Sequence, residues 1–230
     1  MTKRISSIAL FSMICLFASI DVFGQVTPIE IFQQGNNLRV RDRTGTIAIP
    51  YEPYLYDMAN MMRIELFSGE KIEGFYRYNL ETESLENSSA EETLEPGVIK
   101  NFRVTKSDGS STQTFVNIKA LWPDSEYLGF FEQVDENFTT VVKHYLQYKP
   151  ADYNANMNMG NPYDRVEKEI EIYYRVLNKW YLAPQAKKQF IEALSEFKAP
   201  EDIKKFIKKN KIKMAIPSDV AKVIDYVANN

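Results

Sequence analysis

The stretch MRIELFSGEKIEGFYRYN, residues 62–79, decides the fold class of this chain of 230 residues. Apolar and polar side chains alternate along it, so that Ile64 and Leu66 share one face and the charged residues between them share the other. A period of two is typical of a half-buried β-strand. The Ser-Gly-Glu sequence at residues 68–70 favours a tight turn, after which the alternation resumes. The stretch therefore predicts an antiparallel β-hairpin.

Two further pairs of alternating runs follow, each joined by a turn of small and polar residues. Short strands at such even spacing predict an antiparallel barrel or sandwich. Residues 81–95 contain six glutamates and no lysine or arginine, and we expect them to form a mobile acidic loop with one short strand near Leu85. The paired runs are residues 98–104 and 112–118, joined by 107–110, and residues 127–134 and 138–148, joined by 135–137.

The middle of the chain contains an ambiguous segment. Residues 149–163, KPADYNANMNMGNPY, have the composition of turns and are expected to form a loop or a linker. Residues 165–177 alternate as in a strand, but their apolar positions also fit one face of a helix. Their β-branched content, and a Leu177-Asn178 turn before residues 179–182, favour another hairpin.

The last 46 residues show the spacing of helices. Pro184 and Pro200 can each open a helix, and Ser218 is suited to cap a third one. The third helix carries an uninterrupted apolar stripe, which we expect to be buried against the first two helices. The stripe is Val220, Val223, Ile224 and Val227, and its expected neighbours are Phe190, Leu194, Phe206 and Ile207.

Together these patterns predict an α+β fold: an antiparallel β-sheet, either a partly closed barrel or a sandwich, followed by a C-terminal cluster of short helices packed on it. The predicted regions are a signal peptide at residues 1–24, an antiparallel β region at 25–148, a loop or linker at 149–163, and a β-hairpin with helices at 164–230.

The N-terminus has the order of charges and apolar residues of a secretion signal. Lys3 and Arg4 precede an apolar run over residues 8–20, and small residues follow at Val22 and Gly24. The run is shorter than the roughly 20 residues of a membrane-spanning helix. We therefore expect cleavage before Gln25, no transmembrane segment after processing, and export to the periplasm, the outer membrane or the extracellular space.

Composition excludes several classes of site. The only cysteine, Cys15, lies within the signal, so a processed chain would have neither disulfides nor thiolate metal ligands. A single histidine rules out a multi-histidine zinc site. The net charge of −3 gives no electrostatic basis for binding nucleic acid.

Three segments in order carry a resemblance. They are Pro53-Tyr54-Leu55-Tyr56-Asp57 with the 62–79 hairpin, KKFIKKNKIK at residues 204–213, and a final helix with Tyr226. This arrangement resembles a group of uncharacterised secreted envelope proteins of Gram-negative bacteria, and it covers most of the chain after the signal. The resemblance implies an envelope location and a one-piece architecture. No activity is known for the group, so it supplies no catalytic residues.

Two sequence features suggest catalysis on first inspection. His144 lies on the more apolar face of its expected strand, where it could act as a general base or sit at the rim of the core with one hydrogen bond. We favour the structural role, because no nucleophile-elbow motif accompanies it. Ser195 and Lys198 match the S-x-x-K motif of serine–lysine hydrolases, but the companion motifs of those enzymes are missing.

Other candidate sites consist of charged or amide side chains. Glu167, Glu169 and Glu171 would share one strand face, and two carboxylates could cleave a glycosidic bond, but an exposed row is expected instead. Residues 152–158 place Asp or Asn at every second position, as in a calcium loop, yet lack the required glycine and glutamate. Residues 187–213 contain nine lysines and four acidic residues, and we expect a solvated helix face rather than a lipid-binding one.

We therefore predict no catalytic, cofactor-binding or metal-binding residues and no cofactor. The expected function is a non-catalytic envelope interaction or binding module, whose partner is an envelope protein or a small apolar ligand. The alternatives are a barrel-type carrier of an apolar ligand and a carboxylate-dependent hydrolase. A cavity among Phe102, Phe115, Phe130 and Phe138 would favour the carrier, two close buried carboxylates the enzyme, and a filled core with an exposed aromatic patch the interaction module.

Overall fold

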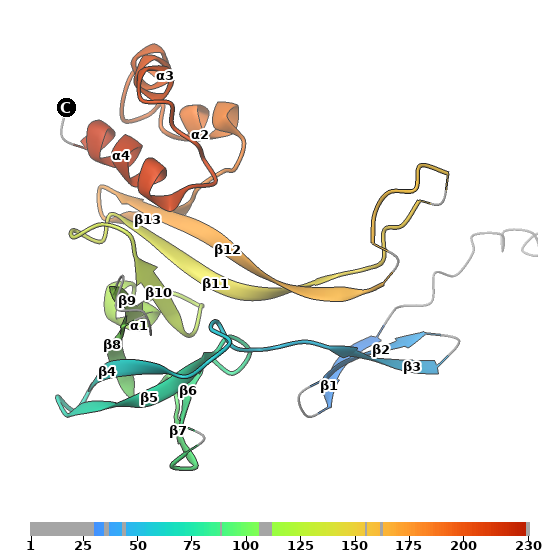
Figure 1. Cartoon of the computed structure of the whole chain (residues 1–230). Helices are drawn as coiled ribbons and strands as arrows, with labels where there is room; N and C mark the ends of the chain where they lie inside the picture. Colours follow the sequence, from blue (N-terminus) through green and yellow to red (C-terminus); the bar gives the residue numbers. More distant parts are fainter. Residues whose placement is uncertain are drawn as a thin grey trace, which may run out of the picture. The chain divides into compact units, whose positions relative to one another are not determined.

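The computed structural model describes residues 30–34, 37–42, 45–87, 89–105, 112–154, 156–161 and 163–228. The chain divides into two compact units, residues 1–49 and residues 50–230. The signal expected at residues 1–24 lies outside the described residues. The strands of the first unit form a three-stranded sheet in chain order, with β1 and β2 antiparallel (Figure 1). They are β1 (Glu30–Gln34), β2 (Asn37–Asp42) and β3 (Gly45–Pro50).

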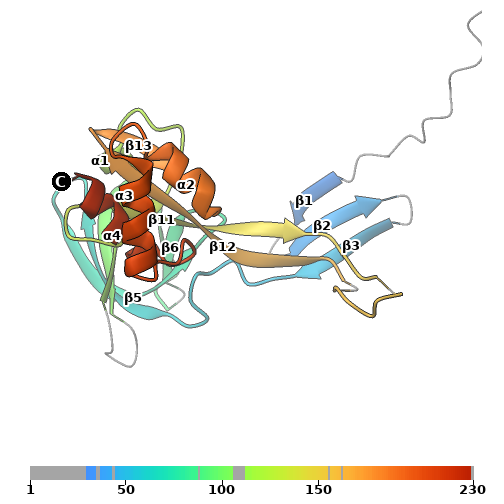
Figure 2. The same cartoon turned by 90° about the horizontal axis from the view of Figure 1, so that it is seen from above.

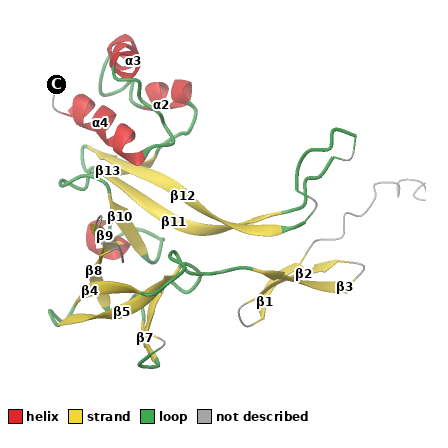
Figure 3. Cartoon of the chain, viewed as in Figure 1, coloured by secondary structure: helices red, strands yellow, loops and turns green. Residues whose placement is uncertain are grey.

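The second unit is built on one ten-stranded antiparallel sheet, and short helices follow at its C-terminal end (Figure 3). The predicted α+β class is therefore confirmed. The sheet does not close on itself: its order is β13-β12-β11-β10-β9-β8-β4-β5-β6-β7, with β13 and β7 at the two edges. The strands are β4 (Asn60–Leu66), β5 (Lys71–Asn79), β6 (Ser84–Asn87), β7 (Glu92–Leu94), β8 (Ile99–Thr105), β9 (Thr112–Asn117), β10 (Phe130–Gln133), β11 (Thr140–Lys149), β12 (Arg165–Val176) and β13 (Lys179–Leu182).

The four predicted hairpins are all present. β4 pairs with β5 around a turn in which Gly69 has φ of +88°, a conformation that costs glycine little. The ambiguous segment after residue 164 is the strand β12, and it returns as β13 through Leu177 and Asn178, whose φ angles of +48° and +67° are those of a tight two-residue hairpin turn. The other two hairpins are β8–β9 and β10–β11.

The acidic stretch at residues 81–95 differs from the expected loop. It forms two strands, β6 and β7, that pair with each other and extend the sheet from β5. Tyrosine hydroxyls hold its carboxylates in place, and these hydrogen bonds offset the cost of partly burying the carboxylates. Each of these donor and acceptor pairs lies at 2.7 Å: Tyr51 with Glu81, Tyr54 with Glu86, and Tyr76 with Glu92.

The sheet curls around a filled aromatic core. The Tyr78 ring on β5 lies 5.5 Å from Phe102, 5.8 Å from Phe115 and 5.7 Å from Phe130. Phe102 and Phe115 stack at 4.7 Å. These rings occupy the space in which the carrier hypothesis expects a cavity. Phe138 is not with them: its backbone turns at φ of +52° before β11 begins, and its side chain packs on the opposite face of the sheet.

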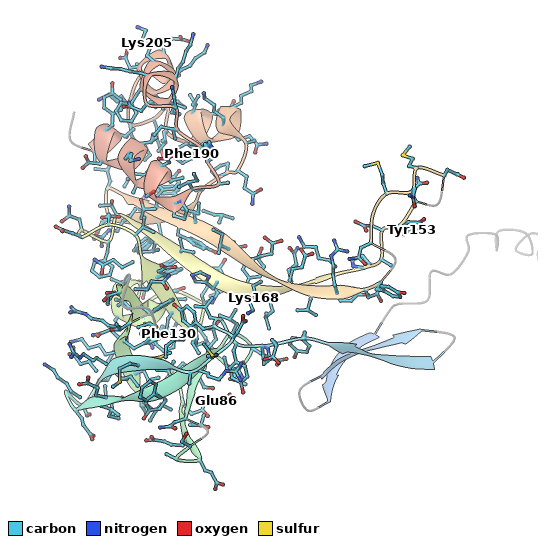
Figure 4. All side chains as sticks on the ribbon, in the orientation of Figure 1. Glu86, Phe130, Tyr153, Lys168, Phe190 and Lys205 are labelled. Carbon is cyan, nitrogen blue, oxygen red and sulfur yellow. The ribbon has the colours of Figure 1, made fainter. Side chains whose placement is uncertain are left out.

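Three helices cover one face of β11 and β12 (Figures 1 and 2). The apolar stripe of the last helix is buried as predicted, in one cluster with Phe190, Leu194 and Ile207, while Phe206 is half-buried beside it. Figure 4 shows Phe190 between its helix and the sheet. The helices are α2 (Lys187–Ala193), α3 (Pro200–Lys209) and α4 (Pro217–Ala228).

Two predicted helix starts are wrong. α2 begins at Lys187 rather than at Pro184, because the Ala186 carbonyl accepts the first helical hydrogen bond, from the Phe190 N–H at 3.0 Å. α4 begins at Pro217, so Ser218 lies inside the first turn instead of capping it. The Ile216 carbonyl, 3.2 Å from the Val220 nitrogen, starts that helix.

The β11–β12 hairpin projects beyond the rest of the second unit (Figure 1). Its strands pair over ten residues, from Thr140 opposite Tyr174 to Lys149 opposite Arg165. The chain between them folds back through a bridge between Asn154 and Met159, so residues 150–164 close a hairpin. No helix among the described residues is both long and apolar enough to cross a membrane.

Candidate functional site

Aromatic side chains gather on the face of β12 and β13 opposite the helices. Neighbouring strand residues point to opposite faces, and Tyr174 packs with the helices while Tyr173 packs here. The cluster holds both tryptophans of the chain, Trp122 and Trp180, whose rings lie 6.4 Å apart. Tyr127 lies 6.1 Å from Trp122 and 5.9 Å from Tyr173. We define the aromatic patch as Trp122, Tyr127, Leu128, Trp180 and Leu182.

A short helix and the loop after it position one half of the patch. Helix α1 (Ile118–Leu121) is capped by the Asn117 carboxamide oxygen, which accepts the Lys119 N–H at 2.9 Å. The buried Ser125 then organises the loop: its N–H donates to the Trp122 carbonyl at 3.0 Å, and its hydroxyl accepts the Tyr127 N–H at 3.1 Å. The loop thereby holds Trp122 and Tyr127 in fixed positions.

The register of β12 and β13 positions the other half. Arg175 lies opposite Trp180, and Tyr173 lies opposite Leu182, so all four side chains share one face. The Arg175 guanidinium lies over the Trp180 ring at 5.4 Å, a cation–π distance. Phe131 supports Trp180 from inside, with ring centroids 5.9 Å apart. The patch therefore rests on a packed cluster.

The patch combines an apolar surface with a polar border. Leu128 is 64 % exposed, Leu182 51 % and Tyr127 43 %, while the two tryptophans are half-buried. Trp, Tyr and Arg are the residues that dominate binding energy at protein interfaces. They are large and stiff, so they lose little entropy when a partner covers them.

A second group of interest is a largely buried polar cluster around Lys143 and His144, neighbours on β11. Lys143 Nζ lies 3.0 Å from Glu83 Oε1, and the Tyr78 hydroxyl donates to Glu83 Oε2. His144 Nε2 lies 2.6 Å from Glu132 Oε2, and the Gln113 amide donates to Glu132 Oε1 at 2.6 Å. We call these six residues the polar cluster.

The chemistry of the polar cluster is that of a structural network. Burial raises the pKa of the Glu83 carboxyl, and the nearby Lys143 ammonium opposes that shift. All four oxygens of Glu83 and Glu132 have a hydrogen-bond partner within the protein. A buried polar group that is fully satisfied in this way stabilises a unique packing. His144 thus has the hydrogen bond expected of a histidine at the rim of the core.

The serine–lysine pair does not form a catalytic dyad. Helix α2 ends at Ala193, so Ser195 lies beyond it and its hydroxyl donates to the Glu192 carbonyl at 2.6 Å. Lys198 Nζ lies 4.1 Å from the centre of the Tyr226 ring and donates to the Tyr226 carbonyl at 3.3 Å. With both groups directed to other partners, the lysine does not take a proton from the serine.

The three glutamates of β12 share one face as predicted, and each has a partner. Lys149 Nζ lies 3.2 Å from Glu167 and 2.5 Å from Glu169, while the Tyr173 hydroxyl donates to Glu171 at 2.8 Å. Hydrogen bonds from Arg165 and Lys149 lower the pKa of Glu167. A glycosidase acid needs a raised pKa, so this shift has the wrong direction for that role.

The Asp- and Asn-rich segment forms turns at the tip of the β11–β12 hairpin. Asp152 Oδ1 accepts the Asn161 N–H at 2.6 Å, and Asn154 Oδ1 accepts the Asn156 N–H at 3.0 Å. The Tyr153 hydroxyl donates to Asn158 Oδ1 at 2.9 Å. The second of these is the hydrogen bond of an Asx turn, and the other two tie distant parts of the tip together. Among the described residues, no three His, Cys, Asp or Glu side chains are grouped as metal ligands.

The aromatic patch was not found from the sequence. Trp122 follows a four-residue helix and Trp180 lies on an edge strand, and only the pairing of β9 to β13 brings them together. The one available signal was that tryptophan occurs only twice in the chain. Comparison of the chain with models of protein families, with curated proteins and with solved structures found no match.

Proposed function

We propose that the protein is a non-catalytic binding module, exported to the cell envelope, that holds a partner protein against the aromatic patch. The observation that carries this proposal is the contact of Trp122 with Trp180 and with the exposed Tyr127, next to the exposed Leu128 in the same loop and the exposed Leu182 on the strand face of Trp180. A patch of large rigid side chains on a buried support meets the requirements of an interface centre. The Arg175 guanidinium beside Trp180 supplies a polar border to it.

Two further features support binding over the alternatives. The core between Tyr78, Phe102, Phe115 and Phe130 is occupied by rings in mutual contact, which argues against an internal apolar ligand. The carboxylates of the polar cluster are bound by side chains of the protein itself, which argues against acid–base catalysis. The charge and apolar pattern of residues 1–24 supports export.

The binding test uses a matched pair of double variants on the chain without its predicted signal. Tyr127→Ser with Leu182→Ser removes exposed apolar surface from the patch. Phe67→Ser with Phe75→Ser removes similarly exposed side chains, 50 % and 58 % exposed, from the β4–β5 hairpin. Each protein is immobilised, incubated with a detergent extract of the source envelope, and its bound proteins are identified by mass spectrometry. We expect the unmodified chain and the hairpin variant to retain the same partner and the patch variant to lose it.

The two tryptophans provide a direct readout for the purified pair. Because both lie in the patch, a partner that covers it should shift their emission to shorter wavelength and protect them from iodide quenching. Identical protein profiles for all three chains, or an emission spectrum that the partner leaves unchanged, would refute the patch as the binding site. Export is tested separately, by mass spectrometry of the exported chain, which should begin at Gln25.

A further inference from the structure

An open groove lies between helices α2 and α3, away from the aromatic patch. It has a volume of about 800 Å³. Its apolar lining comes from Ile191 on α2 and Pro200 at the start of α3, together with the aliphatic stems of lysines on both helices. These helices pack on the face of the sheet that carries Tyr174, whereas the patch lies on the face that carries Tyr173. The groove is thus a separate surface from the proposed binding site.

Four lysines and two glutamates, Glu192 and Glu201, border the groove, so the charge around it is net positive. Lys204 has a carboxylate nearby, that of Glu201 at 3.8 Å. For Lys187, Lys188 and Lys208, no carboxylate of the described residues lies within 4 Å of the amino group. All four side chains are exposed. The groove therefore presents an apolar strip whose border has a net positive charge from lysines of two helices, and its complement is an apolar strip flanked by negative charges.

We propose that the α2–α3 groove binds an acidic amphipathic helix of a partner protein. A helix lays one apolar stripe into a groove and keeps its outer face in water, which suits a groove that is open to solvent. Glutamates one turn to either side of the stripe would reach Lys187 and Lys188 on α2 and Lys204 and Lys208 on α3.

An anionic lipid fits the same surface less well. An acyl chain in an open groove would leave much of its length in water, which is unfavourable for every exposed methylene. Of the large apolar residues of α3, Ile203 and Ile207 are buried in the core and Phe206 stacks on Tyr226 at 4.2 Å, so none is free to insert into a bilayer. The observations therefore favour a peptide over a membrane.

The probe is a fluorescein-labelled synthetic peptide of about 14 residues, four helical turns, with leucines on one face and glutamates flanking them. A second peptide has the same composition in an order that destroys the helical periodicity. Binding is followed by fluorescence anisotropy at low and high salt. We expect the periodic peptide to bind with an affinity that falls as salt rises, and the reordered peptide to bind at least about 10-fold more weakly.

Matched charge reversals locate the site. Lys188→Glu with Lys208→Glu changes two groove lysines, whereas Lys205→Glu with Lys209→Glu changes the net charge equally at exposed positions of α3 that do not line the groove. Figure 4 shows Lys205 on the outer side of α3. The groove variant should weaken peptide binding at least about 10-fold and the control less than about 3-fold. Circular dichroism and the melting temperature should be unchanged in both.

Several outcomes would overturn the proposal: no binding of the periodic peptide, equal binding of the reordered peptide, or equal losses in the two double variants. Sedimentation with phosphatidylglycerol vesicles that the peptide does not compete away would assign the surface to a membrane instead. Tryptophan emission serves as an independent readout. Peptide binding in the groove should leave it unchanged, so this test and that of the aromatic patch fail separately.

Discussion

The two faces of the β11–β12 hairpin are covered to different extents, and the difference separates the face that stabilises the fold from the face proposed to bind a partner. On one face, three helices seal the strands, and the side chains of Phe190, Val223 and Ile224 are fully buried. On the other face, the short helix α1 and its loop cover Tyr173 and Phe131 but leave Tyr127 and Leu128 exposed. Complete cover contributes hydrophobic stabilisation, whereas incomplete cover leaves apolar surface that a partner can still bury.

The largest expected effect lies on the sealed face. Ile224→Ala removes a fully buried side chain from the centre of the helical cluster, and we expect a loss of about 2–5 kcal/mol in the free energy of unfolding. Urea denaturation measures this loss. Leu182→Ala, on the opposite face, is the control and should cost much less, because Leu182 is 51 % exposed. Equal losses for the two variants would show that the faces do not differ as described.

A substitution at Gly129 tests how far the loop with Tyr127 and Leu128 depends on the polar cluster beneath it. Gly129 ends this loop, and its φ is +90°. The carbonyl of the preceding Leu128 accepts a hydrogen bond from Lys143 Nζ at 2.9 Å. A Cβ atom at this position would overlap the Glu83 carboxylate of the polar cluster. Gly129→Ala should therefore lower the stability by about 1–3 kcal/mol.

Gly97→Ala is the matched control for Gly129→Ala. A Cβ atom at Gly97 meets no atom within 4 Å, and its φ is not positive. This variant should have nearly the stability of the unmodified protein, or slightly more, because alanine restricts the unfolded chain. A loss that equals that of Gly129→Ala would contradict the role assigned to the Glu83 carboxylate.

The next largest effect is expected from alkaline pH, which should lower the free energy of unfolding through Tyr174 on the face that the helices cover. Burial raises the pKa of the Tyr174 hydroxyl to about 12, and Tyr181 and Glu196 add to the shift. Because this pKa exceeds the unfolded value of about 10, the contribution of Tyr174 is complete below about pH 10 and is lost as the pH rises toward 12. Urea midpoints measured between these pH values should fall less steeply for Tyr174→Phe than for the unmodified chain. An equal fall of the urea midpoint in the two proteins would show that the Tyr174 hydroxyl is not shielded from solvent.

The smallest change in stability is expected at the patch itself. Tyr127→Ser with Leu182→Ser alters exposed positions, and we expect a shift below about 1 kcal/mol in the free energy of unfolding. The same variant should lose its partner in the binding test. A loss of stability as large as that of Ile224→Ala would mean that these side chains stabilise the fold. Their exposure would then be no argument that the patch is an interface.

Patterns that act over a few neighbouring residues predicted the structure correctly. The hairpin at residues 62–79, the return at Leu177-Asn178 and the stripe from Val220 to Val227 are all as predicted, because alternation and turn chemistry act over a few residues. The prediction failed where charged side chains have hydrogen-bond partners that are distant in the sequence. The glutamates of residues 81–95 indicated a loop because their partners, among them Tyr51 and Tyr54, lie outside that segment.

The sequence by itself determined the four hairpins, the presence of the three C-terminal helices and the apolar stripe that α4 buries, since these follow from the period of the apolar side chains. Tertiary structure alone decided that the ten strands form one open sheet, that Trp122 meets Trp180, and that four lysines of α2 and α3 border one groove. The physical reason is that periodicity states which face of an element is buried but not what covers it. Surfaces that bind partners are set by how the covering elements meet, and that depends on packing between parts distant in the chain.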